Sequence, residues 1–176
     1  MSRKMKIIAA KEAMKLVKNG MKLGLGTGST VNEFLLLLSD EIKNGLSITG
    51  VVTSEETRNL SNKLNIPLST LKKLKNLDLT IDGADEIDKN LSLIKGGGGA
   101  LLREKIVAYN SSQLIIIADK SKIVEELGDF KLPVEVSSYE HEATSSRIMD
   151  KLGNIGYEGF IAVSYTHLTL PTKRIV

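Results

Sequence analysis

The chain has 176 residues, of which 41% are hydrophobic and 26% are charged, a composition typical of an ordinary globular domain. The net charge of +3 is small and the basic residues are scattered, so no nucleic-acid partner is expected. The lack of cysteine excludes disulfides and zinc–thiolate sites, and no apolar run reaches the roughly 18 residues of a membrane span. These features favour a cytoplasmic enzyme or binding protein without a membrane partner.

The chain begins with a predicted helix, strand and second helix. Hydrophobic residues recur every three or four positions from Ile7 to Val17, which predicts an amphipathic helix that stops at Asn19-Gly20. A short apolar run at 21–25 leads into GLGTGST at 24–30, and residues 31–38 form an apolar segment of helical length. A strand, a glycine turn and a helix in this order point backbone N–H groups at an anion.

The same alternation continues along the chain. Further strands are predicted at 47–52, 66–68, 77–81, 91–94 and 113–118, and helices from Thr53–Glu56 onward and at 100–109. The last strand, QLIIIA, is continuously apolar, as expected of a strand that is covered on both faces. The pattern indicates an α/β fold, an open and mostly parallel Rossmann-like sheet with helices on both faces.

Four polar loops follow the predicted strands, at 26–30, 53–54, 82–85 and 119–122. Ligands of open α/β sheets bind beyond the carboxyl ends of the strands. We therefore expect these four loops to converge on one edge of the sheet and to form the site.

The GLGTGST loop does not match the strictest phosphate-binding motifs. Ser29 stands where the dinucleotide fingerprint requires glycine, and the lysine of a Walker loop is absent. Backbone N–H groups and hydroxyls from Thr27, Gly28, Ser29 and Thr30 suit the phosphate of a small metabolite. A merely structural turn is the alternative.

The DGADEID segment carries four carboxylates, Asp82, Asp85, Glu86 and Asp88. It lacks the ligand frame of a calcium loop, so a solvated acidic turn and a proton-transfer site for sugar hydroxyls remain the two interpretations.

The KGGGGALLREK segment places a cation and a glycine run before a helix. Lys95 precedes Gly96, Gly97 and Gly98, and Glu104 follows in the predicted helix. Consecutive backbone N–H groups can bind negative charge, and a carboxylate base facing them is what enediolate formation requires. Glu104 and Arg103 could instead be solvated helix positions, and Lys122 is either a phosphate cation or a surface lysine.

From Pro133 the pattern changes to a smaller α+β element. Val134 and Val136 alternate with polar residues, and 141–152 is predicted as a helix that ends at Gly153. The predicted boundaries are 1–131 for the α/β domain, 132–162 for a partial α+β domain and 163–176 for a tail that fits neither pattern.

Six motifs occur in this order along the chain: GLGTGST, TSEET, IDGADEID, KGGGGALLREKIVA, ADKSK and KLPVEV. The similarity that they belong to runs from about Lys6 to about Phe160. Together they resemble ribose-5-phosphate isomerases of the A type. The resemblance implies interconversion of D-ribose 5-phosphate and D-ribulose 5-phosphate in the non-oxidative pentose phosphate pathway. It also implies a pentose 5-phosphate as the small-molecule substrate, no metal or other cofactor, and a homo-oligomer, either a dimer or a tetramer, for the full-length protein.

The resemblance also assigns roles to residues of this chain. Glu104 falls on the catalytic base, Asp82 and Asp85 on the aspartates that handle ring opening and sugar hydroxyls, and Lys95 on the group that stabilises the enediolate. The substrate-binding positions are Thr27, Gly28, Ser29, Thr30, Asp82, Gly83, Ala84, Asp85, Lys95, Gly96, Gly97, Gly98 and Lys122, with Lys6 as an addition.

The end of the chain departs from the family. Family members continue past this point, whereas VSYTHLTLPT, from Val163, looks like a translated sequencing adapter. We therefore expect a truncated fragment with a non-native tail, weakly active or inactive by itself.

Two other functions remain as alternatives to the isomerase. They are a sugar-phosphate deaminase and a sugar-phosphate-sensing module of the same superfamily, and the sensing module has no need of Glu104.

Overall fold

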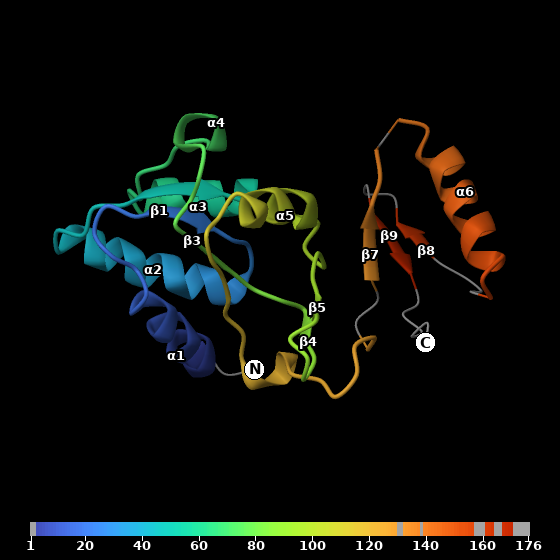
Figure 1. Ribbon diagram of the computed structural model, residues 1–176, viewed down its shortest axis with the longest axis horizontal. Helices are drawn as coiled ribbons and strands as arrows, with labels where there is room; N and C mark the ends of the chain where they lie inside the picture. Colours follow the sequence, from blue (N-terminus) through green and yellow to red (C-terminus); the bar gives the residue numbers. More distant parts are fainter. Residues whose placement is uncertain (1–2, 130–131, 138, 157–160, 164–166, 171–176) are drawn as a thin grey trace. The chain divides into compact units, whose positions relative to one another are not determined.

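The computed structural model describes residues 3–129, 132–137, 139–156, 161–163 and 167–170 (Figure 1). Its contacts divide the chain into two compact units. The first unit comprises residues 1–84 and 102–122, and the second comprises 85–101 and 123–176. The segment 85–101 therefore leaves the first unit after Ala84, and the chain returns to it at Leu102.

The first unit is built on a four-stranded parallel sheet. Its strands run in the order β2-β1-β3-β6, with β1 at Lys22–Leu25, β2 at Thr49–Val52, β3 at Leu79–Asp82 and β6 at Leu114–Ile116. Leu23 of β1 lies opposite Gly50 of β2 and Leu79 of β3. This arrangement confirms the prediction of an open, mostly parallel α/β sheet.

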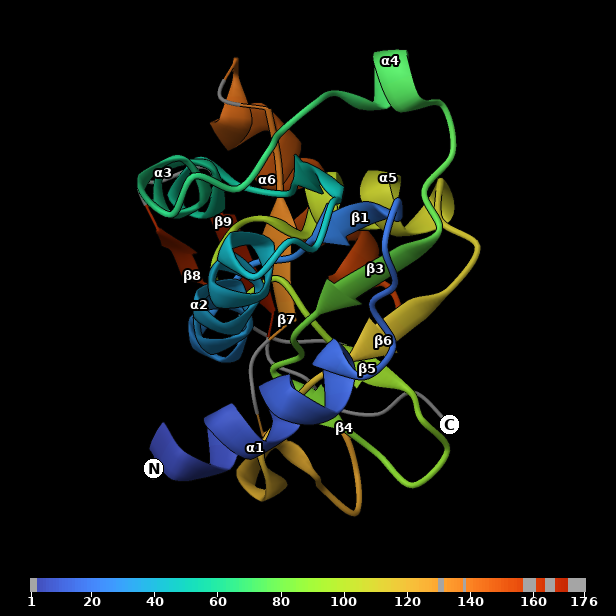
Figure 2. The same cartoon turned by 90° about the vertical axis from the view of Figure 1, so that its left-hand side faces the viewer.

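Helices cover both faces of this sheet. They are α1 (Arg3–Met14), α2 (Ser29–Lys43), α3 (Glu55–Lys63), the short α4 (Leu71–Leu74), α5 (Leu101–Tyr109) and a 3₁₀ turn at Lys120–Lys122. α1 and α2 lie on one side of the strands and α5 lies on the other (Figures 1 and 2). In the part of the chain that the structure describes, no helix is long and apolar enough to cross a membrane.

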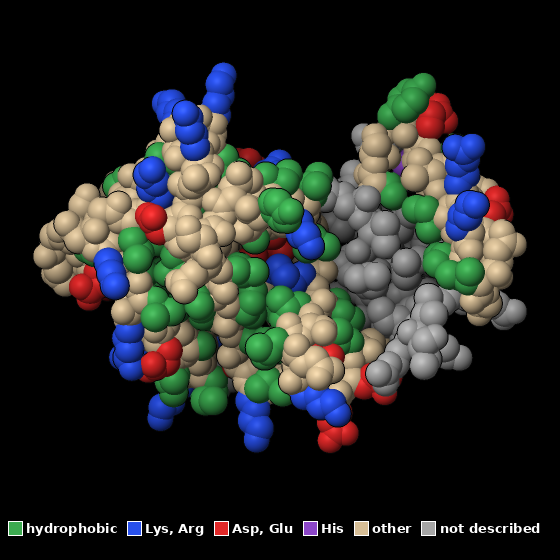
Figure 3. All heavy atoms as spheres, in the orientation of Figure 1, with side chains coloured by type: hydrophobic (Ala, Val, Ile, Leu, Met, Phe, Trp, Pro, Cys, Tyr) green, Lys and Arg blue, Asp and Glu red, His purple; other side chains and the backbone are tan. Residues whose placement is uncertain are grey.

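Hydrophobic residues form a large core on the α1 and α2 face and a small one on the α5 face. Phe34 and Leu35 of α2 pack with Leu23 and Leu25 of β1 and are fully buried. The small cluster comprises Val51, Leu77 and Val107, with Leu71 and Leu74 packed against it. On the visible surface of this unit, acidic and basic side chains are interspersed (Figure 3).

Two predicted strands differ from the structure. Residues 66–68 do not form a strand but a single parallel bridge between Leu68 and Gly50, because Pro67 has no N–H group to donate. The predicted strand 113–118 is shorter, and Leu114 is 42% exposed rather than covered. Since β6 pairs only with β3 in the described sheet, it is an edge strand, which the apolar run alone does not reveal.

The described residues of the second unit after Asp85 form a small hairpin, a three-stranded antiparallel sheet and the helix α6 (His141–Gly153). β4 (Glu86–Ile87) pairs with β5 (Leu93–Ile94), and the sheet has the order β7-β9-β8. The elements of the latter part are β7 (Leu132–Glu135), α6 (His141–Gly153), β8 (Ile161–Val163) and β9 (His167–Leu170). α6 confirms the helix predicted at 141–152.

The predicted tail lies partly within this sheet and partly outside the described residues. Residues 167–170 form β9, which pairs with both β7 and β8, whereas 164–166 and 171–176 lie outside the described residues. The domain boundaries and the non-native origin of the tail remain predictions.

Candidate active site

The carboxylate of Asp82 is held by the loop after β1. Asp82 is the last residue of β3 and is 1% exposed. Its Oδ1 atom accepts hydrogen bonds from the N–H groups of Thr27 at 3.1 Å and Gly83 at 2.8 Å. Gly26 permits this approach, because a Cβ atom at Gly26 would lie 2.2 Å from the same oxygen. The loop therefore requires glycine here to close on the carboxylate.

Threonine hydroxyls connect this loop to the start of α3. The Thr27 and Thr53 hydroxyl oxygens are 2.7 Å apart, and the Thr57 hydroxyl donates to the Gly26 carbonyl at 2.7 Å. Gly28 is the N-cap of α2 and has a φ of 113°, a conformation that favours glycine. These contacts fix the loop from which α2 starts, as the sequence pattern predicted.

Two lysines lie at the same end of the sheet. The Lys6 ammonium donates to the Ser29 hydroxyl at 2.6 Å. The pKa of Asp119 is lowered, mainly because Ser121 donates hydrogen bonds to its carboxylate. The positive charges of Lys6 and Lys122 lower this pKa further, whereas burial of the carboxylate opposes the shift. Lys6 and Lys122 therefore act on one carboxylate that follows β6.

Glu104 lies in the first turn of α5 and is 5% exposed. The alternative of a solvated helix position is therefore wrong for Glu104. It holds for the neighbouring Arg103, whose side chain is 58% exposed. A carboxylate that is shielded from water interacts more strongly with nearby charge than an exposed one does.

The remaining predicted site residues lie in the second unit and form a group of their own. Asp85 Oδ2 accepts a hydrogen bond from the Gly97 N–H at 2.9 Å, which ties the carboxylate to the glycine run. Gly96 has a φ of 99°, and its carbonyl accepts from the Gly99 N–H at 2.8 Å, so the run forms a tight turn. Half-buried Lys95 directly precedes this turn.

Glu86 and Asp88 of the acidic segment have structural partners. Glu86 is 4% exposed and accepts from the Gly128 N–H at 2.7 Å. Asp88 Oδ1 accepts from the N–H groups of Asn90 and Ser92, both at 2.8 Å, and so closes the turn between β4 and β5. Asp88 therefore serves to hold an acidic turn, and its half-buried side chain is neither fully solvated nor part of the core.

The predicted residues thus fall into two groups. The first unit holds Thr27, Gly28, Ser29, Thr30, Asp82, Gly83, Ala84, Glu104 and Lys122, and the second holds Asp85, Lys95, Gly96, Gly97 and Gly98. Among the described residues, no three His, Asp or Glu side chains gather into a cluster that could hold a metal ion.

A family model for ribose 5-phosphate isomerase A (phosphoriboisomerase A) matches residues 49–158, which is more than half of the chain. The chain belongs to this family. Ribose-5-phosphate isomerase A of Rhizobium meliloti strain 1021 is 52% identical over 162 residues, which cover 92% of this chain and 70% of the relative. The resemblance drawn from the six motifs is confirmed.

Solved structures of the family agree. A D-ribose-5-phosphate isomerase in complex with phospho-erythronic acid has a TM-score of 0.89 at 34% identity, covering 99% of this chain and 82% of that one. Ribose 5-phosphate isomerase A from Methanocaldococcus jannaschii has a TM-score of 0.85 at 35% identity, covering 98% and 81%.

In this member of the ribose 5-phosphate isomerase A family, sequence reasoning placed Asp119 in a site loop and Thr57 in a family motif but assigned neither residue a role. Asp119 is 6% exposed, and the charges of both candidate phosphate lysines help to lower its pKa. Its position directly after an apolar strand was an available signal. Thr57 is fully buried and supports the Gly26 loop, and no spacing rule would have indicated that role.

Proposed function

We propose that this chain interconverts D-ribose 5-phosphate and D-ribulose 5-phosphate, an aldose–ketose isomerisation of the non-oxidative pentose phosphate pathway. The observation that carries the proposal is the family match over residues 49–158. The 52% identity to a ribose-5-phosphate isomerase A over 92% of the chain supports it. The same match argues against a deaminase or a sensing module.

Glu104 is proposed as the base of this reaction. It would remove the proton from C2 of the open-chain aldose while O1 gains a proton, which gives an enediol. Return of the proton to C1 and loss of the proton on O2 then give the ketose. The burial of Glu104 supports this role, because water is largely excluded from the carboxylate.

Lys95 and the following amides are proposed to stabilise the negative charge that develops on the enediolate oxygens. Within the tight turn at Gly96–Gly99, the Gly97 N–H donates to Asp85 and the Gly99 N–H to the Gly96 carbonyl, so the N–H groups of Gly96 and Gly98 are the ones proposed to face the enediolate. Because Asp85 already accepts from Gly97, it would orient this turn as well as contact a sugar hydroxyl. Asp82, held by two backbone N–H groups, is proposed to assist ring opening.

The substrate phosphate is proposed to bind where α2 begins. Thr27, Ser29 and Thr30 supply hydroxyls and helix-terminal N–H groups, and Lys6, already bonded to Ser29, supplies a cation. Lys122 would supply a second cation. A relative that binds phospho-erythronic acid, a phosphorylated sugar acid, supports a site with this chemistry. A homo-oligomer and a cytoplasmic location remain further proposals.

The Glu104→Gln variant tests the proposed base. It keeps the shape of the side chain and removes its ability to take a proton, so formation of ribulose 5-phosphate should fall by about a thousandfold. Binding of ribose 5-phosphate, measured by calorimetry, should change little. Glu41→Gln on the exposed surface of α2 is the matched control. Turnover close to that of the unmodified chain would exclude Glu104 as the base.

A further inference from the structure

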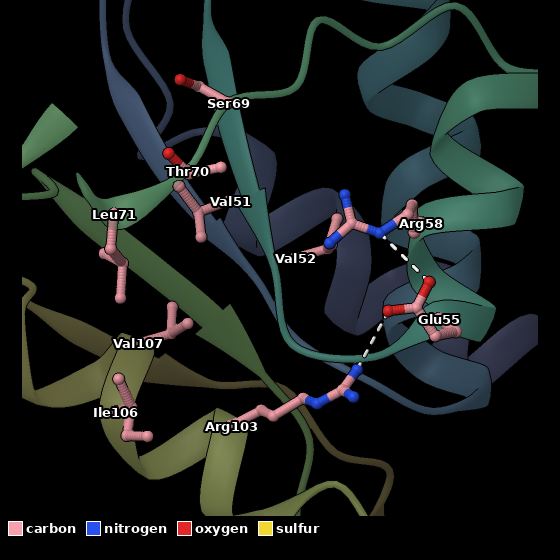
Figure 4. Close-up of a pocket in the computed structure, with 10 residues that line it drawn as sticks. All are labelled: Val51, Val52, Glu55, Arg58, Ser69, Thr70, Leu71, Arg103, Ile106 and Val107. Atoms are coloured by element: carbon pink, nitrogen blue, oxygen red, sulfur yellow. Dashed lines mark hydrogen bonds and ion pairs between the residues drawn. The ribbon is translucent and has the colours of Figure 1, made fainter. Parts of the chain in front are cut away.

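A cavity of about 380 Å³ opens beside β2, between α3 and α5 (Figure 4). Its apolar lining comes from Val51, Val52, Leu71, Ile106 and Val107. The volume lies in the range of small-molecule sites, roughly 300 to 1,000 Å³. None of the predicted active-site residues lines this cavity, so it is separate from the site proposed above.

The polar groups at this cavity form a carboxylate clamp. Glu55 lies between two guanidinium groups: Arg58 Nε is 3.2 Å from Glu55 Oε2, and Arg103 Nη1 is 3.1 Å from Glu55 Oε1 (Figure 4). Arg58 belongs to α3 and Arg103 to α5, so the two cations come from different elements. The three groups together carry one net positive charge.

Both arginines retain hydrogen-bonding capacity. A guanidinium carries five N–H donors, and a carboxylate is best bound by two of them in parallel. Among the described residues, each of these arginines donates only one N–H to Glu55, and no other hydrogen bond of theirs is found. A second carboxylate could therefore be bound with better geometry than Glu55 achieves.

The internal ion pairs are also easily exchanged. The side chains of Arg58, Glu55 and Arg103 are 43%, 64% and 58% exposed, so solvent screens their attraction. Exchanging the Glu55 carboxylate for that of a ligand would then lose little. Ile106, by contrast, is 47% exposed, so a hydrocarbon group that displaces water from it adds to the binding free energy.

From this arrangement we propose that the cavity binds a small organic carboxylate with an apolar body. The ligand carboxylate lies between Arg58 and Arg103 in place of Glu55. The apolar body rests on Leu71 and Ile106, which are the more exposed of the apolar lining residues, and Ser69 and Thr70 also line the cavity. This proposal does not depend on the isomerase activity.

Calorimetric titration of the 176-residue chain with phenylacetate tests the ligand class. Acetate has the carboxylate without the apolar body, and 2-phenylethanol has the apolar body without the charge. Acetate and 2-phenylethanol should each bind at least about tenfold more weakly than phenylacetate. Equal binding of all three, or no phenylacetate binding at tens of millimolar, would overturn the proposal.

Two substitutions of opposite effect test the clamp. Arg58→Gln should weaken phenylacetate binding by about tenfold, because it removes one of the two cations. Glu55→Gln should strengthen binding several-fold, because it removes the internal competitor. Lys43→Gln, which removes a cation from the exposed surface of α2, should leave the affinity unchanged.

Titration in the presence of ribose 5-phosphate tests whether phenylacetate binds outside the active site. Saturating ribose 5-phosphate should leave phenylacetate binding intact, and competition between the two would place the carboxylate in the isomerase site instead. An affinity that Glu55→Gln lowers or leaves unchanged would refute the exchange of carboxylates. Far-ultraviolet circular dichroism confirms that each variant is folded before it is titrated.

Discussion

Asp119 makes the stability of the first unit depend on pH at the level of a single side chain. Its pKa lies below the ordinary value of 3.8, mainly because Ser121 donates hydrogen bonds to the charged form. Because the pKa is lower in the folded than in the unfolded state, the carboxylate stabilises the fold at every pH above its pKa in the unfolded chain. This stabilisation is lost as the pH falls through the pKa of the folded state. Asp119→Asn should therefore reduce the free energy of unfolding at pH 7, and the difference should shrink below about pH 4.

Urea denaturation of both chains at pH 7, 5 and 3 measures this difference. Asp40→Asn removes a carboxylate that is 68% exposed and serves as the control, with a small effect at each pH. If the difference in the free energy of unfolding between the unmodified chain and Asp119→Asn stayed constant down to pH 3, titration of the Asp119 carboxylate would not explain it.

Gly26 sets how closely the loop after β1 approaches Asp82. An added Cβ would lie 2.2 Å from Asp82 Oδ1 and 2.6 Å from the backbone Cα of Asp82, so the strand end itself must move. Gly26→Ala should lower the free energy of unfolding by about 1 to 3 kcal/mol, the usual cost of overpacking. Gly83→Ala is the control for stability, since its Cβ would lie 3.6 Å from the Thr27 carbonyl oxygen. Equal effects of the two substitutions in thermal unfolding would contradict this explanation.

At the level of secondary structure, Ser54 starts α3. Its hydroxyl accepts a hydrogen bond from the Thr57 N–H at 3.0 Å. Ser54→Ala should lower the free energy of unfolding by about 1 kcal/mol, because one N–H group of the first turn loses its partner. Thr70→Ala is matched to it, since Thr70 is the N-cap of α4 but makes no side-chain capping bond. A loss as large for Thr70→Ala in urea denaturation would show that the cap is not responsible.

Most elements could be predicted because their signals are local. The helix period, the polar helix start at Thr53–Glu56 and the apolar strands before polar loops indicated α1, α3 and the parallel sheet. The exposure of Leu114 could not be predicted in this way, because it depends on which strands neighbour β6. Residues 66–68 could not be predicted for the same reason, because their local pattern is apolar but Leu68 pairs with β2 only through one bridge to Gly50.

At the level of the whole molecule, sequence proximity was an incomplete guide to the site. Strand ends of a parallel sheet meet at one edge, so the approach of Thr27 to Asp82 followed from the fold class. Asp82 and Asp85 are three residues apart, yet they belong to different units. The contact of Asp85 with Gly97 depends on the β4–β5 hairpin, whose pairing no spacing rule in the acidic segment specifies.

The strand order of the first unit also has a consequence for synthesis on the ribosome. β1 is made first but lies inside the sheet, where it needs β2 on one side and β3 on the other. β3 in turn remains an open edge until β6 has been made. A nascent chain that ends before Leu114 therefore exposes an unpaired apolar strand edge, the kind of surface on which chains aggregate. That edge stays exposed for at least the time that the ribosome needs to translate from Asp82 to Leu114, however fast the strands themselves pair.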